Sequence, residues 1–266
     1  IDTPVIDKMA SEGMRFTDAH SGSFYSLHSI WTPDLLEACE RDLAAADATA
    51  ENDVVRKRVD MFRKGLQSAG YYLSLRNAVN RCDFVAARDV YERWMRHLDA
   101  IHEAGIHPVG EYRRGYAPRF LGSSVLEGHE RVTGTGRKVL QLPDEWLFRQ
   151  DPEDAGESLG WHERDAAPEG WRPVRTYSAT LGEQGLPESF AWLWYRCTFE
   201  APAELPSGRL FLWFAEIDGR GGKVFLDGEL VGELGPKRGP QEVEVTGKTR
   251  PGKRCTVAVK IDHRRI

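Results

Sequence analysis

The sequence predicts an α+β protein, with an N-terminal three-helix bundle followed by an antiparallel β-sandwich. Two observations lead to this prediction. Between residues 33 and 104, apolar residues recur every three or four positions, as on the buried face of amphipathic helices. From Trp192 to Asp262, short runs alternate apolar and polar residues and are separated by turn residues, a pattern typical of antiparallel sheets with one solvent-facing side.

Residues 1–31 form a lead segment, in which Pro4 and Gly13 bound an expected short helix. The stretch IDTPVIDKMASEGMRFTDAHSGS resembles the N-terminal region of sulfatases. In that family a cysteine or serine, followed by proline and arginine, becomes the nucleophile, whereas here FYSLHSIWTPD follows Ser23. Acidic metal ligands are also absent from the segment, so we expect no sulfatase activity and no metal site.

Residues 32–122 are expected to contain the helical bundle and a connection, and residues 123–137 a glycine-rich linker. Thr32-Pro33-Asp34 is a typical helix start. The second and third helices carry apolar stripes, formed by Val55, Val59, Phe62, Leu66, Ala69 and Leu73, and by Phe84, Ala87, Tyr91, Trp94, Leu98 and Ile101. With the following EYRRGYAPRFLG, this region resembles the helices after the barrel in large glycoside hydrolase relatives.

The sandwich strands are predicted from alternation. Asp227-Gly228 separates two apolar runs and predicts a two-residue hairpin. In the last strand, one face is expected to be buried (Cys255, Val257, Val259 and Ile261) and the other wet (Thr256, Ala258 and Lys260). The run from Leu210 to Phe214 is apolar on both faces, so its outer face is buried as well or covers a partner domain.

The motifs WYRCTFEAP, VFLDGELVG and PGKRCTVAVKI resemble the sugar-binding jelly-roll domain of family 2 glycoside hydrolases. The upstream DEWLFRQDPEDAGESLGW resembles the entry to galactose-binding-like sandwiches. The resemblance implies a jelly roll over residues 138–266 and a non-catalytic, carbohydrate-associated accessory module of a polysaccharide-processing enzyme. A purely structural sandwich without a ligand, or a fragment of a hydrolase whose catalytic domain lies elsewhere, remain the alternatives.

Composition narrows the classes of partner. Basic and acidic residues number 17 and 20 up to Gly134 and 19 and 21 after it, so neither nucleic acid nor a membrane is an expected partner. The four cysteines have no metal-ligand spacing, and no cofactor is expected. The sequence starts at Ile1 without a signal peptide, so we expect a fragment or a mature product. Secretion or a periplasmic location is implied by the resemblance alone.

The candidate partners are therefore a glycan and the catalytic domain of a parent enzyme. Family 2 enzymes carry their catalytic carboxylates on the barrel, so no catalytic residue is expected here. Trp146, Trp171 and Trp194 are interpreted as core or loop anchors. Trp161 and Trp192 are in turn-rich stretches and are predicted to bind a sugar, with Glu216 and Asp218 as hydroxyl acceptors.

Overall fold

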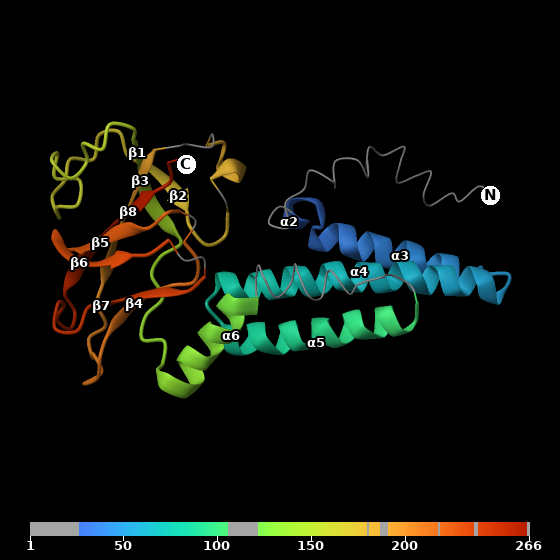
Figure 1. Ribbon diagram of the computed structural model, residues 1–266. Coiled ribbons are helices and arrows are strands. Elements are labelled where there is room, and N and C mark those ends of the chain that lie inside the picture. Colours follow the sequence, from blue (N-terminus) through green and yellow to red (C-terminus); the bar gives the residue numbers. More distant parts are fainter. Residues whose placement is uncertain are drawn as a thin grey trace. The chain divides into compact units, whose positions relative to one another are not determined.

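The computed structural model describes residues 27–105, 122–179, 181–186, 191–217, 219–236 and 239–264. The chain divides into two compact units, residues 1–119 and residues 120–266, and Figure 1 shows a helical part and a part built of strands. The expectations for residues 1–23 lie outside the described residues, as does the connection at residues 106–121. No helix of the described ranges is long and apolar enough to cross a membrane.

The first unit contains α2 (Leu27–Ile30), α3 (Pro33–Ala48), α4 (Asp53–Asn80) and α5 (Phe84–Glu103). The three long helices each begin at a residue whose side chain accepts backbone N–H groups of the first turn: Thr32, Asn52 and Asp83. Such caps satisfy donors that have no partner within the helix. The start predicted at Thr32 is therefore confirmed.

The long helices pack side by side, with α4 in contact with both α3 and α5 (Figure 1). The predicted stripe of α5 is buried throughout, with Trp94 only 1% exposed. The stripe predicted for α4 is wrong in part. Phe62, a member of the stripe, is 48% exposed, while Tyr72 and Leu75, which are not members, are buried. Tyr72 and Leu75 are buried outside the predicted stripe because α4 contacts neighbours on two sides and so buries more of its circumference.

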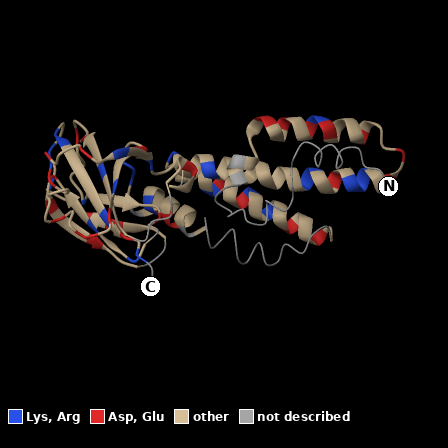
Figure 2. Cartoon of the chain, turned by 90° about the horizontal axis from the view of Figure 1, so that it is seen from above, with Lys and Arg blue, Asp and Glu red and all other residues tan. Residues whose placement is uncertain are grey.

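Basic and acidic residues recur along the helices of the first unit (Figure 2). Among the described residues, ion pairs between side chains four positions apart include Glu37–Arg41, Asp60–Lys64, Arg88–Glu92 and Asp89–Arg93. Pairs at this spacing stabilise a helix by a few tenths of a kcal/mol each, about 0.2–0.5. The side chains of these pairs are partly or largely exposed, as on the solvated face of an amphipathic helix.

The second unit begins with α6 (Ser123–Glu130) and the π-helical turn η5 (Arg131–Thr135), where a linker was expected. The glycines of this stretch disfavour a helix, but tertiary contacts stabilise α6. The Ser124 hydroxyl donates to the carbonyl of Ala215 at 3.0 Å, and Val125 is fully buried. Burial of this kind outweighs the propensity cost of Gly128, which is about 1 kcal/mol.

Within the part of the chain that the structure describes, eight strands form two antiparallel sheets, which Figure 1 shows side by side with the strand labels. The first has the order β2 (Arg172–Arg175), β1 (Glu145–Asp151), β3 (Trp192–Glu200), β8 (Arg254–Asp262), β5 (Gly222–Leu226) and β6 (Glu229–Leu234). The second pairs β4 (Phe211–Phe214) with β7 (Gln241–Glu244). A short 3-10 turn, η6 (Gly182–Gln184), follows β2. Asp227 and Gly228 connect β5 to β6 with φ of 52° and 88°, which confirms the predicted hairpin.

One hydrophobic core joins the two sheets. It contains Phe148, Cys197 and Val257 of the large sheet and Val243 of the small one, with Leu212 packed against it. The core face predicted for β8 is confirmed, and both buried cysteines, Cys197 and Cys255, are free thiols within the core.

The outer face of β8 differs from the prediction. Thr256, Ala258 and Lys260 are 4%, 0% and 3% exposed, although their alternation predicts a wet face. The cause is the long β1–β2 connection, residues 152–171, whose side chains contact this face of the sheet. A strand covered on both sides is buried on both sides.

Candidate ligand site

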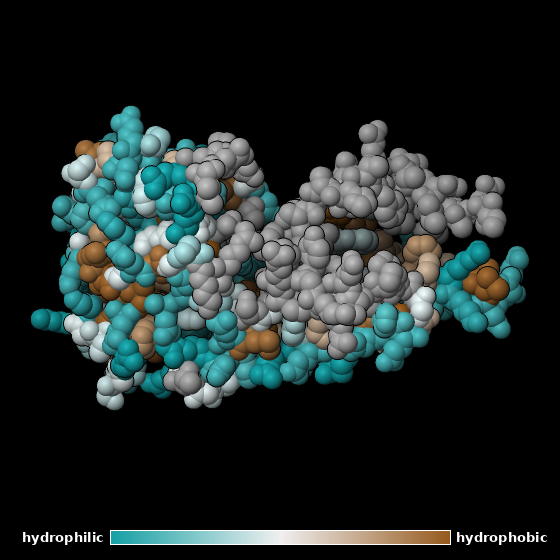
Figure 3. Space-filling model, in the orientation of Figure 1, coloured by the Kyte–Doolittle hydropathy of each residue, from teal (hydrophilic) through white to brown (hydrophobic). Residues whose placement is uncertain are grey.

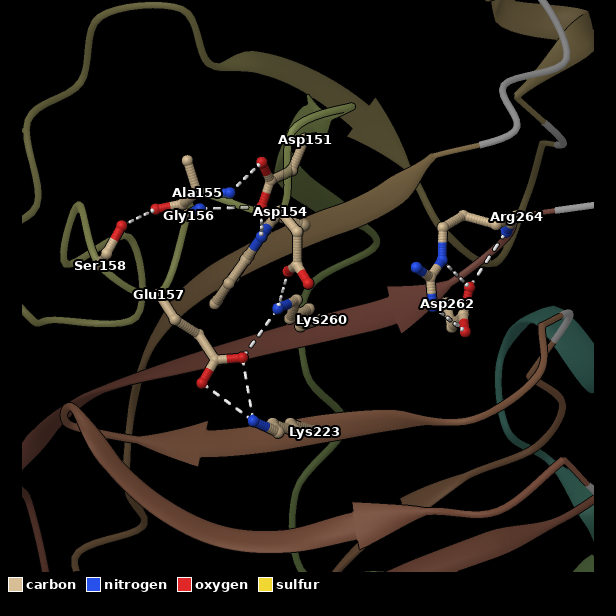
Figure 4. A network of polar contacts seen from close by, with 11 residues as sticks. Asp151, Asp154, Ala155, Gly156, Glu157, Ser158, Lys223, Lys260, Asp262 and Arg264 are labelled. Atoms are coloured by element: carbon tan, nitrogen blue, oxygen red, sulfur yellow. Dashed lines mark hydrogen bonds and ion pairs between the residues drawn. The ribbon is translucent and has the colours of Figure 1, made fainter.

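The β1–β2 connection is tied to the sheet at Asp151, the last residue of β1. Its carboxylate, 2% exposed, accepts the backbone N–H groups of Ala155 and Gly156, both at 2.8 Å. It also accepts the indole N–H of Trp194 on the neighbouring strand β3 at 3.0 Å (Figure 4). One buried carboxylate therefore fixes both the start of the connection and the orientation of a core tryptophan.

Gly156 completes this arrangement because no side chain fits there. A Cβ at this position would lie 2.5 Å from Trp194 Nε1, 2.6 Å from Trp161 Cε3 and 2.8 Å from an Asp151 oxygen. The close approach of a loop to two indole rings thus requires glycine. The spacing of Asp151, Gly156 and Trp161 in the motif DPEDAGESLGW has a structural explanation.

A second anchor is Lys260, whose side chain is 4% exposed on the outer face of β8. Its ammonium group pairs with Asp154 and, at 2.7 Å, with Glu157, and Glu157 also pairs with Lys223 of β5 (Figure 4). Burial opposes ionisation of Glu157, but hydrogen bonds from the two lysines outweigh it and lower its pKa. Burial likewise disfavours the charged Lys260, yet its carboxylate partners raise its pKa. Both groups are therefore held in their charged forms.

Trp161, expected as an exposed ring, is buried at 8% exposure. It makes edge contacts with Trp171 and Trp194, with ring centres 5.9 and 6.2 Å apart. The guanidinium of Arg149 lies 3.9 Å from its ring centre. The ring thus covers the sheet and is covered in turn, because the loop that carries it folds back onto β3 and β8.

Trp192, the first residue of β3, is half-buried. Lys260 Nζ and the Arg264 guanidinium each lie 4.4 Å from its ring centre. Arg264 is held by hydrogen bonds to Asp262, and these lower the pKa of that carboxyl to about 2. A sugar stacking on Trp192 would compete with a paired cation for the ring.

The other two predicted residues follow β4. Glu216 is exposed, and Asp218 lies outside the described residues. The segment after Asp218 does reach the strand end that carries Trp192: the Arg220 N–H donates to the Asp262 carbonyl at 2.7 Å, and Asp262 pairs with Trp192. The structure therefore brings this loop and Trp192 to one end of the large sheet, and buries Trp161 elsewhere on its outer face.

A different group of residues forms a shallow hollow of about 260 Å³ on the small sheet. We call it the Trp213 hollow. Its lining residues come from α6, η5 and the β4–β7 pair: Glu127, Glu130, Arg131, Trp213, Pro240, Gln241 and Glu242. All of them belong to the second unit.

The register of the small sheet explains why Trp213 faces this hollow. Leu212 pairs with Val243 and both pack into the core, so Trp213 and its partner Glu242 lie on the opposite face. Arg131 reaches across from η5, pairs with Glu242 and lies 4.8 Å from the ring centre of Phe211. Because β4 is apolar on both faces, its sequence does not decide whether Leu212 or Trp213 faces outward, and the sequence predicts a linker where α6 forms.

The Trp213 hollow offers the chemistry that sugars use. An indole face packs against sugar C–H groups, while carboxylates and an amide accept or donate hydrogen bonds to hydroxyls. Neither Glu127 nor Glu130 has an ion-pair or hydrogen-bond partner for its carboxylate among the described residues. In the same ranges, no group of three or more histidine, cysteine, aspartate or glutamate side chains is placed to hold a metal ion.

The sequence matches no known family model. It matches no curated protein either. Among solved structures, the chain is similar to the β-glucuronidase of Ruminococcus gnavus in complex with C6-substituted uronic isofagomine, at 24% identity and a TM-score of 0.38. The same enzyme in complex with D-glucuronic acid gives 23% identity and a TM-score of 0.38. The first match covers 46% of this chain and 21% of that one, so the chain spans about a fifth of the length of the enzyme to which part of it is similar.

Proposed function

We propose that this chain is a non-catalytic, carbohydrate-associated module of a polysaccharide-processing enzyme, and that it binds a glycan at the Trp213 hollow. The proposal includes a galactose-binding-like jelly roll for residues 138–266 and a three-helix bundle before it. It starts from the sequence resemblance of the strands to a sugar-binding domain. The parent enzyme's catalytic domain and a glycan are the proposed partners, and the resemblance supports a secreted or periplasmic enzyme.

The observation that carries the proposal is the outward-facing Trp213 beside carboxylates that no described residue neutralises. Most other tryptophans of this unit are used in packing. Trp146 and Trp194 are 6% and 0% exposed, as the sequence predicts for anchors. Trp213 instead lines a hollow whose other walls are mostly polar, so an apolar ring and groups that can bind hydroxyls lie together.

The loop end near Trp192, with Glu216 and Asp218, is the second candidate position for the same ligand. It is favoured by the exposed loop next to the end of β8 and by the half-buried Trp192. A structural module without a ligand is the second candidate function. The observation that favours it is the outer face of the large sheet, where Asp151 and Lys260 anchor the long connection entirely through internal contacts.

A glycan-array screen of the purified chain, followed by affinity electrophoresis with the best binders, tests the proposal. Trp213→Ala should lower the affinity at least about fivefold, since stacking on an aromatic ring contributes about 1–3 kcal/mol. Leu159→Ala is the matched control, because Leu159 is an exposed apolar residue, 63% exposed, on the connection that covers the other sheet.

Loss of binding in Trp192→Ala but not in Trp213→Ala would move the site to the end of the large sheet. No reproducible binder on the array would instead favour the structural module.

A further inference from the structure

Charge distinguishes the Trp213 hollow from a general sugar platform. Its lining includes the three carboxylates of Glu127, Glu130 and Glu242 and one guanidinium, that of Arg131. Arg131 is already paired with Glu242. The hollow therefore presents a net negative charge that comes from Glu127 and Glu130.

These two carboxylates lie one turn apart on the last part of α6 and are both exposed. Like charges at this helical spacing repel each other slightly, so a positive group bound in the hollow would relieve this repulsion.

Resting on the proposed function, we propose that the Trp213 hollow selects its glycan by charge: it binds sugars that carry an ammonium group best, neutral sugars less well and sugars that carry a carboxylate poorly. Trp213 supplies the apolar surface that every sugar ring uses. Glu127 and Glu130 accept hydrogen bonds from hydroxyls and from an ammonium group, and they repel a uronate. Arg131 does not compensate for this repulsion, because Glu242 already neutralises it.

The size of the effect follows from Coulomb's law. Two unit charges about 4 Å apart interact by about 1 kcal/mol in water, which corresponds to a factor of about five in affinity. With two carboxylates, an amino sugar should bind about 5- to 25-fold tighter than its N-acetylated form. A uronate oligomer should bind weaker than the neutral form by a similar factor. Added salt should reduce both differences, because the site is open to solvent.

The test uses three soluble oligosaccharides of equal length, made of glucosamine, N-acetylglucosamine or galacturonate, and a tetralysine peptide. Their affinities for the whole chain are measured by isothermal titration calorimetry. The variant Glu127→Gln/Glu130→Gln should bring the three sugar affinities within about threefold of one another. Glu153→Gln/Glu204→Gln is the control, because it removes two exposed carboxylates of the same unit that lie outside the hollow. Glu130→Lys should make the uronate the tightest of the three.

Equal binding of all three sugars to the parent would overturn the charge selection and leave the proposed function standing. An ammonium preference that survives the double variant would also overturn it, since the charge would then act elsewhere. Tetralysine binding as tightly as the glucosamine oligomer, and unaffected by Trp213→Ala, would show a cation site and not a sugar site. Absence of binding by every sugar, with none on a glycan array, would overturn the proposed function together with this inference.

Discussion

Replacing Asp151 by alanine should destabilise the second unit by about 3–5 kcal/mol. The substitution removes the acceptor of three donors: the N–H groups of Ala155 and Gly156 and the indole N–H of Trp194. A buried donor without a partner costs about 1–3 kcal/mol. Ala155 is only half-buried and regains water, so the sum lies below three times the upper value. A loss of this size is a large part of the stability of an ordinary domain, about 5–15 kcal/mol.

The measurement is urea unfolding followed by tryptophan fluorescence. Six of the eight tryptophans lie beyond residue 140, so fluorescence reports mainly on the second unit. Far-UV circular dichroism follows the helices of the first unit separately. Trypsin gives a second readout, because Arg164 is an exposed cleavage site in the connection and its cleavage should accelerate in Asp151→Ala.

Two further variants separate the hydrogen bonds from a general effect of substitution. Asp151→Asn keeps one acceptor oxygen and should cost about half as much. Trp194→Phe removes the indole donor together with part of a buried ring, and its effect should be smaller in the Asp151→Ala background than in the parent, because the contribution of the hydrogen bond is already lost there. A free-energy change below about 1 kcal/mol in Asp151→Ala, or full additivity with Trp194→Phe, would refute this account of how the connection is held.

Three further predictions concern helix packing, acid stability and thiol reactivity. Trp94→Ala should destabilise the helices by about 3–5 kcal/mol, while Phe62→Ala should cost below about 1 kcal/mol, because the two side chains are 1% and 48% exposed. Similar losses of unfolding free energy in both variants, measured by circular dichroism, would contradict the packing. The pKa values of Glu157 and Asp262 are lowered in the folded state from their ordinary 4.5 and 3.8, in the second case to about 2. These carboxyls therefore stabilise the fold above their ordinary pKa, and that stability is lost as the pH falls toward 2. Glu157→Gln should flatten the acid limb of a plot of unfolding free energy against pH, and an unchanged slope would count against the pairing. Burial raises the pKa of Cys197 to about 11, so it should react with a thiol reagent only when the unit unfolds, and rapid labelling in the native state would contradict its burial.

Features that depend on neighbouring residues in the chain were predictable. The cap at Thr32 and the turn at Asp227-Gly228 both arise within a few residues, and both are present. The buried stripe of α5 follows because this helix packs on one side. Phe62 continues the apolar period of α4 yet is exposed, because periodicity within one helix does not state which part of its surface the neighbouring helices cover.

The features that were missed depend on contacts between distant segments. The helix α6 forms across a glycine-containing stretch because Ser124 and Val125 are fixed by tertiary packing, and Ser124 bonds a carbonyl 91 positions away. The Trp213 hollow needs that helix on one side and the β4–β7 register on the other. Alternation alone shows that Trp213 and Leu212 lie on opposite faces of β4, but it shows neither which face is the core nor what lies opposite the other.

Trp192 and Trp194, on one strand, also show that alternation does not predict what covers a side chain. Two positions apart on β3, both face the side of the sheet opposite the main core, and Lys260 lies within 5.7 Å of both ring centres. Trp194 becomes fully buried because Asp151 and the 152–171 connection close over it, whereas Trp192 lies at the strand end beside Arg264. Strand alternation gives the two indoles the same face, and the fold of a distant loop gives them different environments. For this reason the outward ring on the small sheet, which lies apart from that loop, is the stronger candidate for contact with a ligand.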